Sequence, residues 1–257
     1  GSGSAALIEE ALRYKEAGYD AFKFRPGTDW KHAGMTLNKY VPMLEKLREA
    51  VGPDFRLMHE GLGMNLGSLE AIITDFAPVL EELGFYWFEE AFGGTQYEHI
   101  DLFIRLREAL PSVRVSGGER FRDRFETQEW LDRQALDIVQ TDCNVTGITE
   151  NWHIARMAHL RGITLIPHNW HGGGTTMGNA HLVAAIPNRE YCELNQTYNP
   201  LKEGIFKEPL TVKNGVMSLP DGAGLGVELI DDVEKKFPFV PGSYKKPNPF
   251  DSVTNSI

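Results

Sequence analysis

Short apolar runs alternate with longer amphipathic stretches from the start of the chain to about residue 196. The apolar runs are rich in β-branched and aromatic residues and have the length of buried strands. They end at Arg25, Glu60, Glu89, Glu119, Asp142, His168 and Glu193. In the stretches between them, apolar residues recur every three or four positions, as in amphipathic helices. These stretches are 5–18, Leu37–Val51, Leu69–Leu83, Ile100–Leu110, Thr127–Arg133, Ile148–Leu160 and Thr175–Ala185.

Unbroken alternation of apolar strands and helices predicts an α/β protein of the TIM-type (β/α) barrel kind, with chemistry at the carboxyl ends of the strands. The pattern contains seven strands and seven helices, and it begins with a helix. A barrel with one strand missing would expose two unpaired edges. We therefore expect the first strand to lie outside this chain. Gly1-Ser2-Gly3-Ser4 is then either an appended linker or the loop that follows the missing strand.

The alternation stops at Thr197, so we predict a boundary there. Residues 1–196 form the barrel in this interpretation, and residues 197–257 form a C-terminal hairpin and an extended tail. Asn214-Gly215 between two apolar segments is the sequence signature of a hairpin turn. The last residues contain several prolines and favour an extended course.

Composition and charge narrow the class of protein. The chain has 257 residues, a net charge of −10 and 42% hydrophobic residues. That charge disfavours nucleic acid as a partner, and no apolar run approaches the ~18 residues of a membrane span. Cys143 and Cys192 lack metal-type spacing and are expected to be reduced thiols. We expect a soluble, cytoplasmic, enzyme-like domain without a membrane partner.

Three of the strand ends carry a glutamate at nearly constant spacing. The intervals are 89 − 60 = 29 and 119 − 89 = 30 residues, about one strand-plus-helix unit. Glu60, Glu89 and Glu119 would meet at one end of the sheet, where three carboxylates repel one another unless a cation lies between them. Such hard oxygen ligands suit Mg²⁺, with Mn²⁺ as the alternative. Each glutamate taken singly could instead cap a helix or pair with an arginine.

Asp142 and His168 end neighbouring strands. A carboxylate that accepts a hydrogen bond from one ring nitrogen orients an imidazole and raises its basicity, so this pair predicts a general base. Lys23 and Arg25 are two residues apart on a strand and share the face that points into the barrel mouth. They either act in the chemistry or balance the carboxylates. Arg25 stays protonated and is a poor base.

Two further histidines are weaker candidates. His171 follows His168 in a loop and is as consistent with a surface role as with a site role. His59 precedes Glu60, so strand alternation directs it away from the barrel interior. Only a bulge would turn His59 inward, where it could serve as an acid.

These residues in this order resemble the catalytic barrel of the enolase superfamily, most closely its mandelate racemase-like, acid-sugar dehydratase branch. The resemblance covers roughly residues 5–230. It rests on Phe22-Lys23-Phe24-Arg25, Glu60, Phe88-Glu89-Glu90, Gly118-Glu119-Arg120, Asp142, His168, Glu193 and Leu219–Val227. It implies a modified (β/α)7β barrel and an N-terminal capping domain, outside this chain, that closes the site. The C-terminal part would pack on the barrel or on that domain. We expect a homo-oligomer that needs the capping domain.

The resemblance also implies roles. Glu60, Glu89 and Glu119 would hold Mg²⁺, the Asp142–His168 pair would be the base on one face of the substrate, and Glu193 would be a carboxylic acid bonded to the substrate carboxylate. Arg25 replaces the second lysine of the family's commoner Lys-x-Lys pattern, which disfavours a two-base racemase.

The implied activity is that of a metal-dependent hydro-lyase in carbohydrate acid catabolism. It abstracts the proton alpha to a carboxylate and eliminates water, and so dehydrates an acid sugar to a 2-keto-3-deoxy acid. A racemase or epimerase of a related hydroxy acid stays open, as does a non-catalytic barrel that binds an acidic metabolite.

Overall fold

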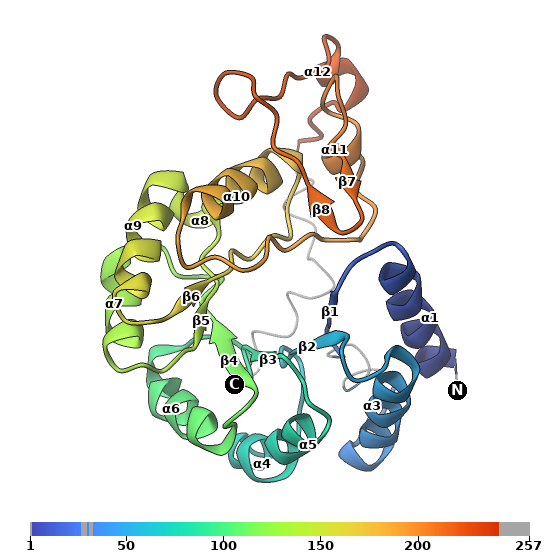
Figure 1. The fold of residues 1–257 in the computed structure, drawn as a ribbon, viewed down its shortest axis with the longest axis vertical. Helices are drawn as coiled ribbons and strands as arrows, with labels where there is room; N and C mark the ends of the chain where they lie inside the picture. The colour runs from blue at the N-terminus through green and yellow to red at the C-terminus, as the bar shows by residue number, and fades with distance from the viewer. Residues whose placement is uncertain (1, 27–29, 31–32, 242–257) are drawn as a thin grey trace.

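Six parallel strands form the centre of the molecule in the computed structural model, which describes residues 2–26, 30 and 33–241. The strands pair in chain order, from β1 to β6, so each helical crossover leads to the next strand. Their bounds are β1 (Ala21–Phe24), β2 (Arg56–Glu60), β3 (Trp87–Glu89), β4 (Arg114–Gly117), β5 (Ile138–Val139) and β6 (Thr164–Leu165). The strands curve into an arc with the helices on its outside (Figure 1), which confirms the predicted α/β architecture.

The helices follow the predicted stretches closely. They are α1 (Ser2–Glu16), α3 (Leu37–Val51), α4 (Leu69–Ala71), α5 (Ala77–Glu82), α6 (Ile100–Ala109), α7 (Arg124–Asp132), α8 (Cys143–Thr146), α9 (Ile148–His159), α10 (Gly173–Ala185), α11 (Pro200–Glu203) and α12 (Val233–Lys236), with a 3₁₀ turn at Tyr97–His99. The stretch predicted as one helix from Leu69 contains a π-helical segment at Ile72–Phe76. Pro78 follows that segment. Because proline has no N–H to donate, the α-helical bonding pattern fails there.

The strand predicted to end at Glu193 is not present as a strand. Tyr191-Cys192-Glu193 is irregular in the described structure, and β6 is therefore the last strand of the sheet. A strand is defined by a ladder to a neighbour, and none of the described residues supplies one here. The segment still has the predicted alternation, because the side chains of Tyr191 and Glu193 reach Asp20 and Lys23 across the open side of the arc.

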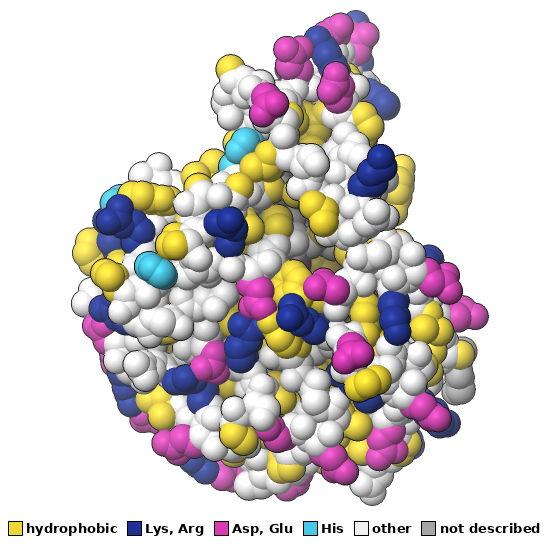
Figure 2. Space-filling view, viewed as in Figure 1, with side chains coloured by type: hydrophobic (Ala, Val, Ile, Leu, Met, Phe, Trp, Pro, Cys, Tyr) yellow, Lys and Arg dark blue, Asp and Glu magenta, His cyan; other side chains and the backbone are white. Residues whose placement is uncertain are grey.

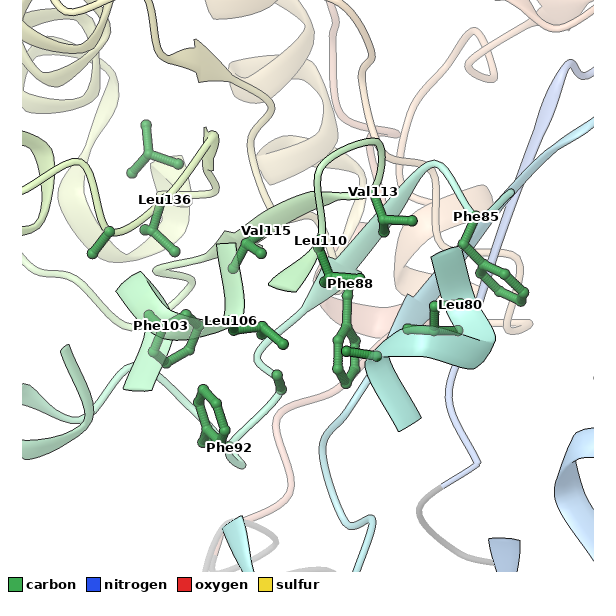
Figure 3. Close-up of a cluster of buried hydrophobic side chains, with 14 of the residues drawn as sticks. Leu80, Phe85, Phe88, Phe92, Phe103, Leu106, Leu110, Val113, Val115 and Leu136 are labelled. Carbon is green, nitrogen blue, oxygen red and sulfur yellow. The ribbon is translucent and has the colours of Figure 1, made fainter. Parts of the chain in front are cut away.

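Two apolar layers position the strand ends. The larger lies between the sheet and the outer helices and contains Phe88, Phe103, Leu106 and Val115, all fully buried (Figure 3). The smaller lies inside the arc and consists of Met58, Trp87, Ile138 and Ile166. Each member of this inner layer precedes a polar inward-facing residue by two positions, as strand alternation requires. The inner layer is thus an apolar floor beneath a polar upper end.

The amino ends of the strands are closed by paired charges. Arg56 and Arg114 both approach Glu190, with N–O distances of 3.7 and 2.8 Å. Both guanidinium groups also lie over the ring of Tyr86, at 4.4 and 4.2 Å from its centroid. Figure 2 shows acidic and basic side chains next to one another over the middle of the face that it displays. At this end Arg56 and Arg114 thus each lie next to a carboxylate and an aromatic ring.

The C-terminal part contains the predicted hairpin, β7 (Val212–Lys213) and β8 (Val216–Met217). Asn214 and Gly215 have φ of 52° and 71°, as in a type I′ turn. The turn packs against the end of α1 so closely that a Cβ at Gly215 would lie 2.5 Å from the carbonyl oxygen of Gly18. The predicted extended tail falls largely on residues 242–257, outside the described residues. No helix in the described part of the chain has the length and apolar character of a membrane span.

Candidate active site

The three strand-end glutamates come to the same end of the sheet. Glu60 and Glu89 are register partners on β2 and β3. Glu119 lies beyond β4 in a turn rather than on the strand. The turn needs Gly118, which has φ of +104° and would place a Cβ 2.7 Å from the ring of Phe121.

Lys23 links this group to the open side of the arc. Its ammonium lies 2.7 Å from Glu89 and 2.8 Å from Glu193. Burial lowers the pKa of Lys23, but Glu193, Glu89 and Glu60 outweigh it, so the pKa is well above the ordinary value. Lys23 is therefore a fixed positive charge that holds two carboxylates.

Glu89 is the most completely bonded of the three glutamates. Trp87 Nε1 and Gln140 Nε2 donate to its Oε2 at 3.2 and 2.9 Å, in addition to Lys23. Burial alone would raise the pKa of Glu89, but the positive charge of Lys23 and the hydrogen bonds from Lys23 and Gln140 lower it below the ordinary value. Glu89 is thus held ionised, with a fixed orientation.

Arg25 lies on the outer side of the glutamates. Its Nη1 is 3.3 Å from Oε1 of Glu60. Its guanidinium also lies 5.7 Å from the ring centroid of Trp170. Arg25 and Trp170 thus stand together at the rim of the site, and both are partly exposed to solvent.

Glu60 and Glu90 have too little positive charge near them to offset their burial and the neighbouring carboxylates. Burial, followed by the charges of Glu89 and Glu119, raises the pKa of Glu60 to about 7 in spite of Lys23 and Arg25. Burial and the same neighbouring carboxylates raise the pKa of Glu90 to about 8. Both carboxyl oxygens of Glu90 are buried without a hydrogen-bond partner in the described structure, and its φ is +42°, unusual for a residue with a side chain.

The predicted imidazole–carboxylate pair is formed. His168 Nδ1 lies 2.9 Å from Asp142 Oδ2, and His168 Nε2 lies 3.2 Å from Glu119 Oε2. Burial lowers the pKa of His168, but the hydrogen bond to Asp142 and the charges of Glu193 and Glu119 raise it to about 9. His171 joins the pair, with its Nε2 3.3 Å from the same Asp142 oxygen.

Asp142 is fully buried and is positioned by groups that the sequence analysis did not identify. Its Oδ1 accepts from the backbone N–H of Asn144 at 2.8 Å and from Asn179 Nδ2 at 3.4 Å. Asn179 Nδ2 also donates to the carbonyl oxygen of His168 at 2.9 Å. Asn179 is a buried amide on α10. An amide between Met177 and Leu182, on a helix with few polar residues after Thr176, was the signal that could have found it.

Glu193 is placed on the same side as Lys23. The backbone N–H of Asn169 donates to Glu193 Oε2 at 2.9 Å, and Asn169 Nδ2 donates to the Glu193 carbonyl oxygen at 2.8 Å. Gln140 and Asn169 are further polar members of the site, and Gln140 is one that the sequence analysis left without a role. Their positions, two before Asp142 and one after His168, contained the signal.

His59 faces outward, as strand alternation predicted. Its Nε2 is 2.8 Å from Tyr40 Oη, and the ring is packed among Phe24, Phe76 and Phe88. Burial lowers the pKa of His59 to about 3, so it is neutral. The alternative in which a bulge turns His59 into the site is wrong.

The donor set of the glutamates fits a divalent cation. Carboxylate oxygens suit Mg²⁺, and the raised pKa of Glu60 and the unpartnered oxygens of Glu90 show a local excess of negative charge. Glu60, Glu89 and Glu119 would hold the ion. In the described structure, however, one group of three residues has all its ligand atoms within 4.8 Å of one another, and it is Asp142, His168 and His171. The three glutamates are not drawn together to that extent.

Comparison with known proteins accords with this arrangement. The family model "Enolase C-terminal domain-like" matches residues 6–233. Arabinonate dehydratase from Saccharolobus solfataricus is 35% identical over 89% of this chain and 59% of its own length. D-galactarolactone cycloisomerase from Agrobacterium fabrum is 32% identical over 79% of this chain and 54% of its own length. The chain thus spans somewhat more than half the length of these relatives.

Solved structures of the same family also resemble this chain. The 3,6-anhydro-D-galactonate cycloisomerase from Zobellia galactanivorans superposes with a TM-score of 0.79, at 29% identity, over 91% of this chain and 63% of that one. An enolase superfamily member from Polaromonas superposes with a TM-score of 0.78, at 26% identity, over 93% and 60% of the two chains. The chain therefore belongs to the enolase superfamily, to its C-terminal domain-like family and the mandelate racemase-like, acid-sugar dehydratase branch.

Proposed function

We propose that this chain carries the catalytic centre of a Mg²⁺-dependent hydro-lyase that dehydrates an acid sugar to a 2-keto-3-deoxy acid. The observation that carries the proposal is the position of His168. Its Nδ1 is held by Asp142, and its Nε2 points at Glu119, one of the three glutamates that would hold the cation. A base and a cation site face each other across the mouth of the barrel. Relatives named as dehydratases of arabinonate and gluconate support the substrate class.

Lys23 lies on β1 and Arg25 directly follows it, whereas Asp142 and His168 follow β5 and β6. Lys23 fixes Glu89 and Glu193. In the proposal Glu193, as a protonated carboxylic acid, would donate a hydrogen bond to the substrate carboxylate. When bound, a divalent cation at Glu60, Glu89 and Glu119 would stabilise the negative charge that develops on the substrate carboxylate. Arg25 keeps its proton at working pH, so the chain offers one base rather than two.

His168 performs the proton transfers in this proposal. Neutral imidazole takes the α-proton at Nε2, while Asp142 orients the ring through Nδ1. The enediolate then expels the β-hydroxyl, which leaves as water with the proton that His168 returns. The enol product tautomerises to the 2-keto acid. In the chain without a cation the raised pKa of His168 favours the protonated ring at neutral pH, so one deprotonation generates the neutral base, which each turnover then restores.

Isotope exchange tests the proposal. The chain is incubated with Mg²⁺ and a panel of acid sugars in D₂O, and both α-proton exchange and 2-keto acid formation are followed. His168→Asn should abolish both and leave cation binding intact, whereas Glu89→Gln should abolish cation binding as measured with Mn²⁺ by electron paramagnetic resonance. Glu150→Gln, which removes a carboxylate paired with Arg124 away from the site, is the matched control. Exchange that persists in His168→Asn at the original rate would exclude His168 as the base.

A cycloisomerase is the second candidate, because the A. fabrum relative and the Z. galactanivorans structure carry that name. The same base would act, but no water would be lost. Product mass separates the two functions, since dehydration removes one water and isomerisation leaves the mass unchanged. The same proposal includes four further expectations. They are a cytoplasmic location, a homo-oligomer, completion of the site by an N-terminal capping domain, and a boundary at residue 197.

A further inference from the structure

Asp142 is shared by two imidazoles in an arrangement that the proposed proton transfer does not require. Its Oδ2 lies 2.9 Å from His168 Nδ1 and 3.3 Å from His171 Nε2. Orientation of the base needs only the first of these contacts. The three ligand atoms lie within 4.8 Å of one another, and the two imidazole rings are inclined at 80° with centroids 6.1 Å apart. The group therefore has the composition and spacing of a metal site.

The ligand types select the metal. Two imidazole nitrogens and one carboxylate oxygen suit Zn²⁺ and related transition ions, whereas Mg²⁺ prefers oxygen. With metal–ligand distances of about 2.0 Å, the ligands of a tetrahedral site lie roughly 3.3 Å apart. The two distances to Asp142 Oδ2 are close to this value. We propose that Asp142, His168 and His171 form a Zn²⁺ site with one open position, separate from the three-glutamate site.

Surrounding groups support the carboxylate as a metal ligand. The second oxygen of Asp142 is occupied by the backbone N–H of Asn144 and the amide of Asn179, which leaves Oδ2 for the metal. Such outer hydrogen bonds orient ligating side chains. Asp142 is fully buried, while the His171 side chain is 39% exposed. The His171 side of the group is therefore in contact with solvent.

Occupation of this site has a consequence that rests on the proposed function. For the metal to bind, His168 must release its Nδ1 proton to the solvent. The ring then no longer donates to Asp142, and its electron pair at Nδ1 is held by the ion. The Nε2 atom retains a proton and cannot accept one from the substrate. Zn²⁺ at this position is therefore an inhibitor that captures the base, and Mg²⁺ does not displace it.

Direct binding tests the site independently of any activity. The chain is titrated with Zn²⁺ against a chromophoric chelator in excess Mg²⁺. The wild-type chain should bind one tight equivalent. His171→Gln can still donate a hydrogen bond to Asp142 but is a poor Zn²⁺ ligand, and it should weaken binding by about 10-fold or more. His159→Ala removes an exposed imidazole at the end of α9 and should bind as the wild type does. Glu119→Gln should still bind one equivalent of Zn²⁺.

Two other outcomes of the titration would contradict the proposed Zn²⁺ site. Equal affinity of the wild type and His171→Gln would show that His171 is not a ligand, and loss of Zn²⁺ in Glu119→Gln would place the ion at the glutamates. For the inhibitory role, the ratio of turnover with and without Zn²⁺ is compared between wild type and His171→Gln. Equal ratios would overturn that role. If no variant turns over an acid sugar even when the capping domain is supplied, the proposed function fails, while the chelator titration still decides the metal site.

Discussion

Asp142→Asn tests the coupling between the buried carboxylate and the imidazole. The pKa of His168 is raised from 6.5 to about 9 although burial lowers it, and the hydrogen bond to Asp142 is the largest cause that raises it. The difference corresponds to about 3 kcal/mol of preferential stabilisation of the protonated ring. Removal of the negative charge at 2.9 Å should lower the pKa of His168 by about 1 to 3 pH units.

The sign of the effect on folding follows from the direction of the shift. Because the folded-state pKa is raised, the stabilisation is fully present below pH 6.5 and is lost as the pH rises through about 9. The free energy of unfolding of the metal-free wild type should therefore fall across this range. Glu60 and Glu90, whose pKa values are raised from 4.5 to about 7 and about 8, also lower it, from pH 4.5 up to those values. The difference in unfolding free energy between the wild type and Asp142→Asn, followed against pH, isolates the contribution of the Asp142–His168 pair.

Two measurements check this reasoning. Nuclear magnetic resonance of the His168 ring gives its pKa in each variant, and urea unfolding between pH 6 and pH 10 with a chelator gives the free energies. Glu150→Gln removes a carboxylate bonded to Arg124 and should leave the His168 titration unchanged. An unchanged His168 pKa in folded Asp142→Asn would refute the argument, because the charges of Glu119 and Glu193 would then suffice to raise it.

Three further changes have expected outcomes that unfolding experiments can measure. Glu90→Gln should stabilise the metal-free chain by about 2 to 5 kcal/mol at pH 9 and little at pH 5. The reason is that the wild-type carboxyl has a raised pKa, so the wild type loses stability as the pH rises through about 8. Equal effects at both pH values would contradict this. His59→Ala should cost about 3 kcal/mol or more, because it leaves a cavity and removes the buried hydrogen bond between His59 Nε2 and the Tyr40 hydroxyl. A folded variant without α-proton exchange would instead give His59 a role in the chemistry. Gly215→Ala should lower the free energy of unfolding more than Gly84→Ala does. Both residues have positive φ, but only a Cβ at position 215 would lie 2.5 Å from a backbone atom. Equal losses of stability would show that the hairpin does not depend on this contact.

The local pattern predicted most of the secondary structure. Helix α3 has the predicted bounds, and α6 and α9 end within one residue of theirs, since each follows a clear amphipathic period. Pro78 shows a limit of prediction from the apolar pattern. Its single missing N–H donor introduced a π-helical segment into a stretch whose apolar period is unbroken. Residues 191–193 show a second limit, since a strand needs a partner and the apolar pattern does not reveal whether one is in place.

The sequence by itself determined which residues share an end of the sheet. Strand alternation and the constant length of the strand–helix unit place Glu60, Glu89 and His168 there, and they direct His59 outward, because side-chain direction along a strand has a period of two. Only the tertiary structure decided which polar groups touch. Asn179, Gln140 and His171 come from different elements, and their contacts with Asp142 and Glu89 depend on how helices and loops pack over the strands. Burial decided the charge states as well, since the distance between carboxylates and their removal from water are properties of the folded chain alone.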